Sequence, residues 1–131
     1  MAYSTGISFS ISGNGVNSIS SSLTITSDNV ENFQITVPVG ADLHVDFQMT
    51  LAVVLAYCFQ ADGALRMETN TGVGTGTAGE TFDLEADTPL FWYDGIQLSK
   101  HFTDDVDELY LTNTGEADVT LNIVVARDVT V

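Results

Sequence analysis

The sequence predicts a single all-β domain, with a jelly roll as the preferred topology. Apolar residues recur at every second position along most of the chain, turn-forming Gly, Asn, Asp and Pro separate the alternating segments, and no segment has the period of a helix. About ten short strands result, which favours an antiparallel sandwich or barrel. Eight strands plus an N-terminal hairpin match a jelly roll. An immunoglobulin-like sandwich is the alternative, but it requires a Cys and Trp spacing that this chain lacks.

The N-terminal segment predicts a β-hairpin. Ile7, Phe9 and Ile11 alternate with serines, and Gly13-Asn14-Gly15 supplies residues that tolerate a tight turn. A second strand is expected over about residues 18–26. We therefore expect one β-domain over residues 1–131, with residues 1–26 as a hairpin or arm and residues 27–131 as the jelly-roll core. The arm has the weakest apolar pattern, so we expect an edge element that can dock on a neighbour.

The centre of the chain carries the longest alternation. Phe33, Ile35 and Val37 form one expected strand, which Pro38 and Gly40 close. Every odd position from Leu43 to Phe59 is then apolar. A single straight strand of this length would reach roughly 55 Å, too long for a small domain, so we expect a break at residues 48–50.

The even positions after this break are also apolar, namely Ala52, Val54, Ala56 and Cys58. A strand with two apolar faces is covered on both sides. The second cover is either another subunit, which predicts a homo-oligomer and plausibly a trimer, or a layer of the same chain.

The last third of the chain predicts shorter strands. Leu65 and Met67 begin the series, a loop rich in Asn, Thr and Gly follows at residues 69–79, and strands resume at residues 81–85 and 89–93. After an irregular stretch at residues 97–107, two β-rich segments flank Asn113-Thr114-Gly115-Glu116, which predicts a final hairpin.

Charge excludes two classes of partner. Three basic residues against 18 acidic ones give a net charge of −15. Binding to nucleic acid or to anionic membranes depends on Lys and Arg, so neither is expected. The longest apolar run, Leu51 to Phe59, is too short to span a bilayer, and the first residues lack the pattern of a secretory signal, which predicts synthesis in the cytoplasm. The acidity fits either solubility before assembly or adaptation to high salt.

The strongest catalytic pattern is His44-Val45-Asp46 with a distant His101. Two histidines and one carboxylate in this order form the iron site of jelly-roll oxygenases. However, His44 and Asp46 share a strand face with Gln48 and Thr50, which is typical of a solvated surface, and no Arg follows His101 closely to hold an oxo-acid. Two surface histidines are the simpler interpretation, and we expect no catalytic residues, metal or cofactor.

Two binding patterns also have simpler interpretations. Asp104, Asp105, Asp107 and Glu108 offer oxygens to calcium, but without EF-hand spacing they are more typical of a solvated loop. Phe91-Trp92-Tyr93 resembles a sugar-stacking platform, although alternation sends Trp92 to one side of the strand and Phe91 and Tyr93 to the other. Cys58 is the single cysteine and lies in an apolar run, which favours a small buried side chain over a disulfide or a nucleophile.

Several stretches resemble small β-rich structural proteins of tailed bacteriophages. The similarity in order and spacing covers most of residues 30–128, and its motifs are Val37-Pro38-Val39-Gly40, Asp87-Thr88-Pro89-Leu90-Phe91-Trp92 and the run from Asp104 to Asn113. The chain departs from that pattern in its extreme acidity and its apolar 51–59 segment. The resemblance implies a virion structural protein that binds the major capsid protein as a decoration or cement protein, is assembled in the host cytoplasm and has no active site. A carbohydrate-binding module is the main alternative, and the iron oxygenase is the other.

Overall fold

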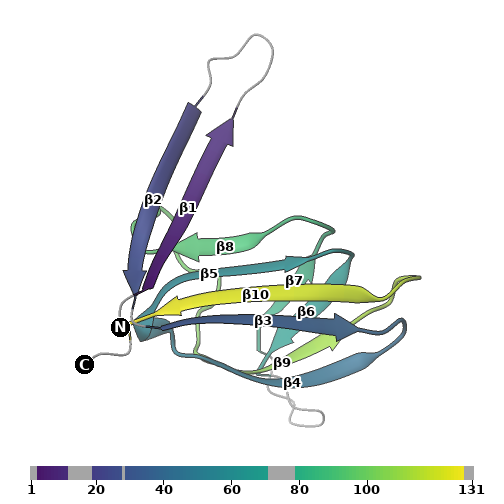
Figure 1. Ribbon diagram of the computed structural model, residues 1–131. Helices are drawn as coiled ribbons and strands as arrows, with labels where there is room; N and C mark the ends of the chain where they lie inside the picture. The colour runs from purple at the N-terminus through teal and green to yellow at the C-terminus, as the bar shows by residue number, and fades with distance from the viewer. Residues whose placement is uncertain (1–2, 12–18, 28, 71–78, 129–131) are drawn as a thin grey trace.

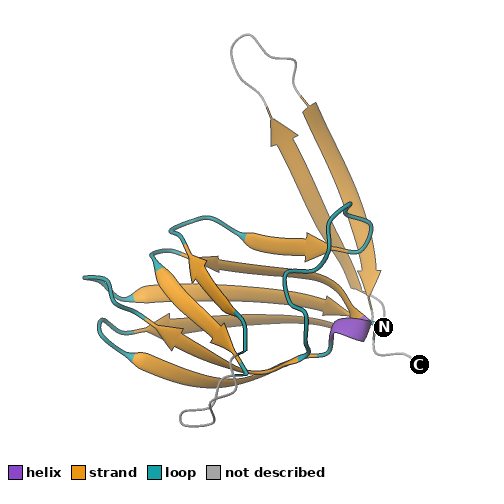
Figure 2. Cartoon of the chain, turned by 180° about the vertical axis from the view of Figure 1, so that it is seen from behind, coloured by secondary structure: helices purple, strands orange, loops and turns teal. Residues whose placement is uncertain are grey.

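The computed structural model describes residues 3–11, 19–27, 29–70 and 79–128. Its ten strands are β1 (Tyr3–Ile11), β2 (Ile19–Ser27), β3 (Asn29–Val37), β4 (Asp42–Met49), β5 (Val54–Ala61), β6 (Leu65–Thr69), β7 (Thr81–Leu84), β8 (Leu90–Tyr93), β9 (Val106–Thr112) and β10 (Val119–Arg127). One short 3₁₀ turn, η1 (Leu51–Val53), is the helical element of the described residues. The all-β prediction is therefore confirmed, and Figures 1 and 2 show two packed sheets with a projecting hairpin.

Strands β3 to β10 form an eight-stranded jelly roll. The two antiparallel sheets have the orders β3-β10-β5-β8 and β4-β9-β6-β7. The chain crosses between the sheets at every connection except β6 to β7, which pair directly. This interleaving of two Greek keys defines the jelly roll and confirms the preferred topology.

The long alternating segment from Leu43 to Phe59 is divided between two strands, as its length predicted. Strand β4 ends at Met49, η1 follows, and β5 begins at Val54 in the opposite sheet. Alternation continues on both sides of the break, so Phe47 and Met49 of β4 and Tyr57 and Phe59 of β5 all face the core. The expected break at residues 48–50 is confirmed.

The expected final hairpin is wrong. Strand β9 pairs with β4 and β6, whereas β10 pairs with β3 and β5, so the segment from Asn113 to Asp118 is a crossover between the sheets. Asn113 is buried at this corner, where its amide nitrogen donates to the carbonyls of Val37 and Ala117. Residues 113–116 do connect two strands, but a turn sequence does not determine whether the two flanking strands belong to the same sheet.

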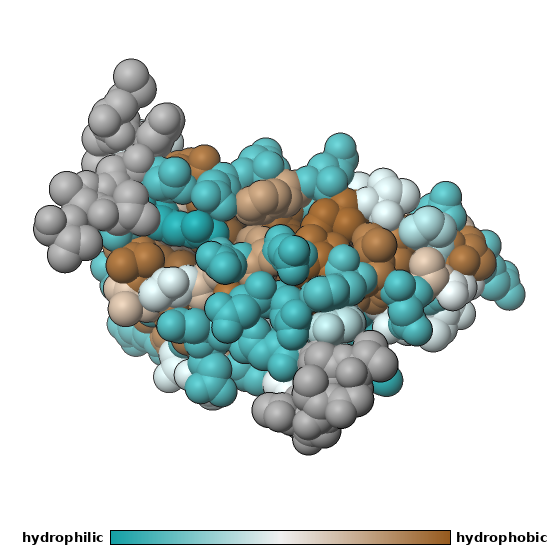
Figure 3. Space-filling view, turned by 90° about the horizontal axis from the view of Figure 1, so that it is seen from below, coloured by the Kyte–Doolittle hydropathy of each residue, from teal (hydrophilic) through white to brown (hydrophobic). Residues whose placement is uncertain are grey.

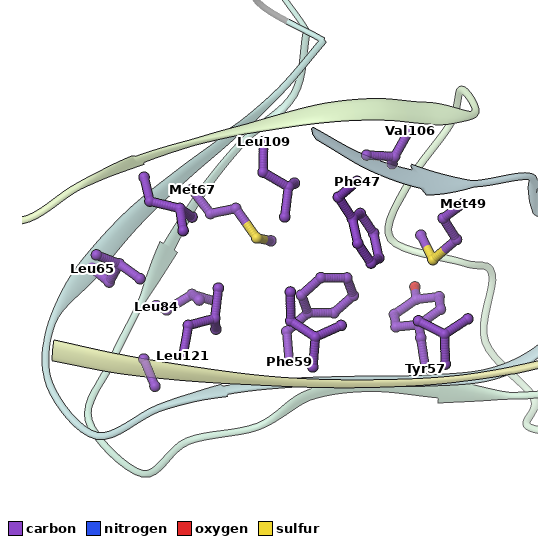
Figure 4. Close-up of a cluster of buried hydrophobic side chains, with 14 of the residues drawn as sticks. Phe47, Met49, Tyr57, Phe59, Leu65, Met67, Leu84, Val106, Leu109 and Leu121 are labelled. Carbon is purple, nitrogen blue, oxygen red and sulfur yellow. The ribbon is translucent and has the colours of Figure 1, made fainter. Parts of the chain in front are cut away.

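The core lies between the two sheets and is rich in aromatic contacts (Figure 4). Phe59 is fully buried at its centre, with ring centroids 6.0 Å from Phe47, 5.7 Å from Tyr57 and 5.5 Å from Phe102. Phe102 comes from the irregular stretch that precedes β9, and it also contacts Phe82 of β7 at 4.9 Å. This stretch therefore closes one end of the core, a role that the sequence pattern did not indicate.

The edge formed by β3 and β4 leaves part of the core accessible. Phe33, Ile35, Leu43 and Val45 pack against the core but remain half-buried. Figure 3 views the molecule from the side on which β4 lies in Figure 1, and hydrophobic atoms form a band there between hydrophilic ones. A turn with Gly40 at φ +73° joins the two strands, as Pro38 and Gly40 predicted.

The N-terminal hairpin projects from the sandwich as an arm. Strands β1 and β2 pair along their whole length, from Tyr3 opposite Ser27 to Ile11 opposite Ile19, and form a two-stranded sheet of their own. Figures 1 and 2 show the arm leaving the body near the start of β3 and pointing away from both sheets. The expected turn at residues 13–15 and most of the expected loop at residues 69–79 lie outside the described residues.

Candidate binding groove

A groove of about 470 Å³ lies between the arm and the outer face of the β3-β10-β5-β8 sheet. We call it the outer groove. Its residues come from one arm strand and three sheet strands with their flanks: Gly6, Ala56, Tyr57, Cys58, Gln60, Pro89, Phe91, Trp92, Val124 and Ala126. Apolar residues predominate, and such a lining is typical of a surface that binds another molecule.

Strand alternation builds the floor of this groove. Tyr57 and Phe59 face the core, so Ala56 and Cys58 between them face outward. The register places Phe91 of β8 beside Cys58 and Tyr93 beside Ala56, which gathers the outward apolar residues of two strands. The second apolar face of β5 is thus present, although it is smaller than expected.

The even-numbered residues before Ala56 do not belong to this face. Ala52 lies in η1, and Val54 is buried in the main core between the sheets. The register shift of β10 against β5 between Ala126 and Arg127 accompanies this change, because a bulge breaks the strict alternation of faces.

Part of the outer apolar face is already buried within the chain. Ala126 is 1% exposed and Ala56 is also buried, and Val30, Leu55 and Tyr93 pack around them as a second, smaller hydrophobic cluster. Strand β2 contacts β5 at this end. The chain therefore covers only part of its outer apolar face, and the rest lines the groove.

Charge is absent from both walls of the groove. None of the lining residues is acidic or basic. The arm continues this pattern, because residues 1–27 contain no Asp, Glu, Lys, Arg or His, so all 18 acidic and all three basic residues follow Ser27. This uneven distribution of charge can be read directly from the amino-acid sequence.

The outer face of the other sheet is strongly acidic. Its outward carboxylates are Asp42, Asp46, Glu68, Asp83 and Glu108. Arg66 and His44 lie among these carboxylates. Arg66 Nε is 2.9 Å from Asp83 Oδ1, and His44 Nε2 is 2.9 Å from Glu108 Oε2. The molecule therefore has one charged sheet face and one face that is uncharged around the groove.

The residues of the expected iron pattern lie in two separate places. His44 is on the acidic outer face, where its ring stacks on Tyr110 at 4.6 Å and its Nε2 is 3.8 Å from Asp46 Oδ1. His101 follows β8 and instead contacts Tyr57, a core-facing residue of β5. The structure does not bring the three side chains together. Within the described part of the chain, no three His, Cys, Asp or Glu side chains form a group that could hold a metal ion.

The His101 contact is built for a neutral imidazole. The Tyr57 hydroxyl forms a hydrogen bond of 2.8 Å with His101 Nδ1 and accepts the His101 backbone N–H at the same distance. Burial lowers the pKa of His101 below 6.5, and burial raises the pKa of Tyr57 above 10.0, so both side chains are uncharged at neutral pH.

We expect this contact to make stability depend on pH. Below about pH 6.5 the unfolded chain protonates His101 first, so its contribution to stability is lost as the pH falls from 6.5 through the lower folded pKa. Thermal unfolding at pH 8 and pH 5.5 should show a larger decrease in Tm for wild type than for His101→Gln. Equal decreases in the two proteins would contradict this assignment.

The acidic stretch from Asp104 to Glu108, which runs into β9, holds loops in place. Asp105 Oδ1 accepts the Leu51 backbone N–H at 2.8 Å, and the Asp107 backbone N–H donates to Asn70 Oδ1 at 2.7 Å. The Glu108 carboxylate contacts His44, as described above. The Asp105 and Glu108 carboxylates considered for calcium thus have different partners, and Asp104 and Asp107 are exposed to solvent.

The aromatic stretch divides between the two sides of β8, as alternation predicted. Trp92 is buried, its Nε1 donates to the Leu98 carbonyl at 3.1 Å, and Lys100 Nζ lies 4.7 Å from the ring centroid. Phe91 is 38% exposed and Tyr93 half-buried on the outer face. Trp92 therefore has no free ring face for a sugar, and Phe91 is the accessible aromatic side chain of the groove.

Cys58 lies on the groove floor with a thiol that burial keeps protonated. It forms no disulfide, is half-buried, and its pKa is raised by desolvation. Because the thiolate is the reactive form, we expect iodoacetamide at pH 8 to alkylate native Cys58 at least about 10-fold more slowly than the urea-unfolded chain. Intact-mass spectrometry over time measures both rates, and equal rates would show a freely accessible, unperturbed thiol.

Among the described residues, no helix has the length and apolar character needed to cross a membrane.

Comparison with known proteins gives distant structural similarity alone. No protein-family model matches the chain, and no curated protein matches it. Similar solved structures include the following two. One is a de novo designed double-stranded β-helix, with 16% identity, a TM-score of 0.44 and coverage of 72% of this chain and 97% of the other. The second belongs to Bacillus endospore appendages, described as disulfide-linked pili, with 12% identity, a TM-score of 0.39 and coverage of 77% and 89%.

Proposed function

We propose that the protein is a non-enzymatic structural protein, and that it joins a larger protein assembly through contacts of the arm and the outer groove. The observation that carries this proposal is the uncharged surface that these two elements share in a chain of net charge −15. An uncharged surface on an otherwise acidic protein is suited to protein–protein contact, because burying it requires no desolvation of ions.

The assembly that the sequence resemblance implies is a virion. The motifs from Val37 to Gly40, from Asp87 to Trp92 and from Asp104 to Asn113 resemble those of small virion proteins, and on that ground we propose a decoration or cement role on the major capsid protein. The acidic outer face of the β4-β9-β6-β7 sheet suits this role, since mutual repulsion keeps free subunits soluble before they bind.

Fractionation of lysates tests this function. In a density gradient of gently lysed producing cells, the wild-type chain should sediment with large particles. Phe91→Glu, which places a charge in the groove, should move the chain to the top of the gradient. Gln34→Glu is the matched control, because it adds the same charge to the exposed outer face of the same sheet away from the lining, and it should stay with the particles.

Two results would overturn the proposal. Wild-type chain that remains at the top of the gradient would contradict membership of a large assembly. Binding to a glycan array that Phe91→Ala or Tyr93→Ala abolishes would replace it with the carbohydrate-binding alternative, now centred on the outward aromatic residues.

A further inference from the structure

We infer that the outer groove receives the N-terminal arm of a second copy of this chain. This inference rests on the proposed function, since it names the occupant of the same groove. It extends the proposal from binding in general to self-association by a specific pair of surfaces, the arm on one copy and the groove on the other.

The arm needs a surface to pack on. In the part of the chain that the structure describes, β1 and β2 pair with each other and with no other strand. An isolated two-stranded hairpin is marginally stable in water, and at least a third strand or a packed face is needed to hold it. Beyond its root, the arm extends away from the two sheets (Figure 1).

The charge distribution is compatible with a second copy as the occupant. Two molecules of net charge −15 repel each other, and most pairs of surfaces would bring carboxylates together. The arm and the groove are uncharged, so their contact is compatible with the acidity of both copies. A strongly basic partner would instead find its complement on the outer face of the β4-β9-β6-β7 sheet, where the carboxylates lie.

The groove also offers backbone hydrogen bonds to an incoming strand. Strand β8 is the last strand in its sheet and pairs only with β5 among the described residues. Its free edge runs beside Phe91 at the wall of the groove. A strand that adds to this edge extends the sheet beyond β8, which is the common mode of strand addition, so an arm strand of a second copy can pair with β8 next to the groove.

The geometry limits the assemblies that can form. Arm and groove are different surfaces of one chain, so two copies satisfy the contact by reciprocal exchange, and more copies satisfy it in a closed ring or an open chain. The number of copies follows from the measured mass.

Sedimentation equilibrium of the purified full-length chain between 1 and about 100 µM tests the contact. We expect wild type to self-associate, and we expect Phe91→Glu to weaken association at least about 100-fold, because it buries an unpaired charge. Gln34→Glu should associate as wild type does. A wild-type monomer over the whole range, or a Phe91→Glu chain that associates like wild type, would overturn the inference.

Directed disulfide formation identifies the occupant. One sample is the wild-type chain, whose only thiol is Cys58 on the groove floor. The other carries Cys58→Ala with either Thr5→Cys or Ser8→Cys, an odd and an even position of β1. Oxidation of the mixture should give a disulfide-linked heterodimer for at least one arm position, and much less for Cys58→Ala with Thr81→Cys, which is on the other sheet.

The two proposals fail in different ways. Equal yields from the arm and Thr81 cysteines would overturn arm exchange, even if the chain still sediments with particles. Efficient arm-to-Cys58 linkage in a chain that never joins a particle would support arm exchange and contradict the proposed function.

Discussion

Phe59→Ala is expected to lower the free energy of unfolding by about 3–5 kcal/mol, the largest single effect in the core. Phe59 is fully buried and lies within aromatic contact distance of Phe47, Tyr57 and Phe102. Truncation removes its buried area and leaves a cavity between the two sheets, which the strands on either side cannot close without breaking their pairing.

Urea unfolding followed by circular dichroism measures this change. The matched control is Phe91→Ala, the same substitution at the 38% exposed position on β8, and it should cost less than about 1.5 kcal/mol. The two variants compare the loss of stability caused by the same substitution in the core and on the groove wall. Similar losses in both would contradict the placement of Phe59 at the centre of the core.

The second large effect is expected at the corner between β9 and β10. The Asn113 side chain is 1% exposed and makes three hydrogen bonds, donating to the carbonyls of Val37 at 3.0 Å and Ala117 at 2.8 Å and accepting from the Gly115 N–H at 3.0 Å. Asn113→Ala leaves these backbone groups without their partner, and each buried unsatisfied group costs about 1–3 kcal/mol. We expect a total loss of about 2–4 kcal/mol.

Thermal and urea unfolding of two further variants test whether the loss of stability comes from the hydrogen bonds of the Asn113 side chain. Asn113→Asp keeps the acceptor for Gly115 but removes both donors, so most of the loss should remain. Asn122→Ala, at an exposed position of β10, should change stability by less than about 0.5 kcal/mol. A neutral Asn113→Ala would show that the crossover between the sheets does not depend on this side chain.

The fold could be predicted because alternation is a local signal. Every second residue from Leu43 to Phe59 is apolar, and this alternation identifies the strands. The physical limit on strand length predicted the break in this segment, where η1 lies. The prediction of a final hairpin was wrong because strand pairing is not a local property. Strands β9 and β10 pair with strands that are distant in sequence, and Asn113 donates to Val37, which is 76 positions away. Turn statistics consider only neighbouring residues and do not detect such contacts. The same holds for Phe102, whose place in the core is set by β5 and β7.

The binding groove was partly predictable. The outward positions of Ala56 and Cys58 and the division of Phe91 from Trp92 both follow from alternation and are confirmed. The position of the outer groove could not be predicted, because it depends on the direction in which the arm projects, and no local sequence pattern specifies that direction. His44 and His101 show the same limit, because their spacing in sequence matches an iron site while the topology places them on different parts of the molecule.

The uncharged arm and outer groove form the proposed binding surface of this protein. Electron cryo-microscopy of a particle that contains the chain tests this proposal most directly, because the jelly roll and its projecting arm are recognisable in a map. We expect protein density to fill the outer groove beside Phe91 and to cover the arm, while the acidic face around Glu108 and Asp46 remains open. A map in which the groove faces solvent and the chain is held through the acidic face would contradict it.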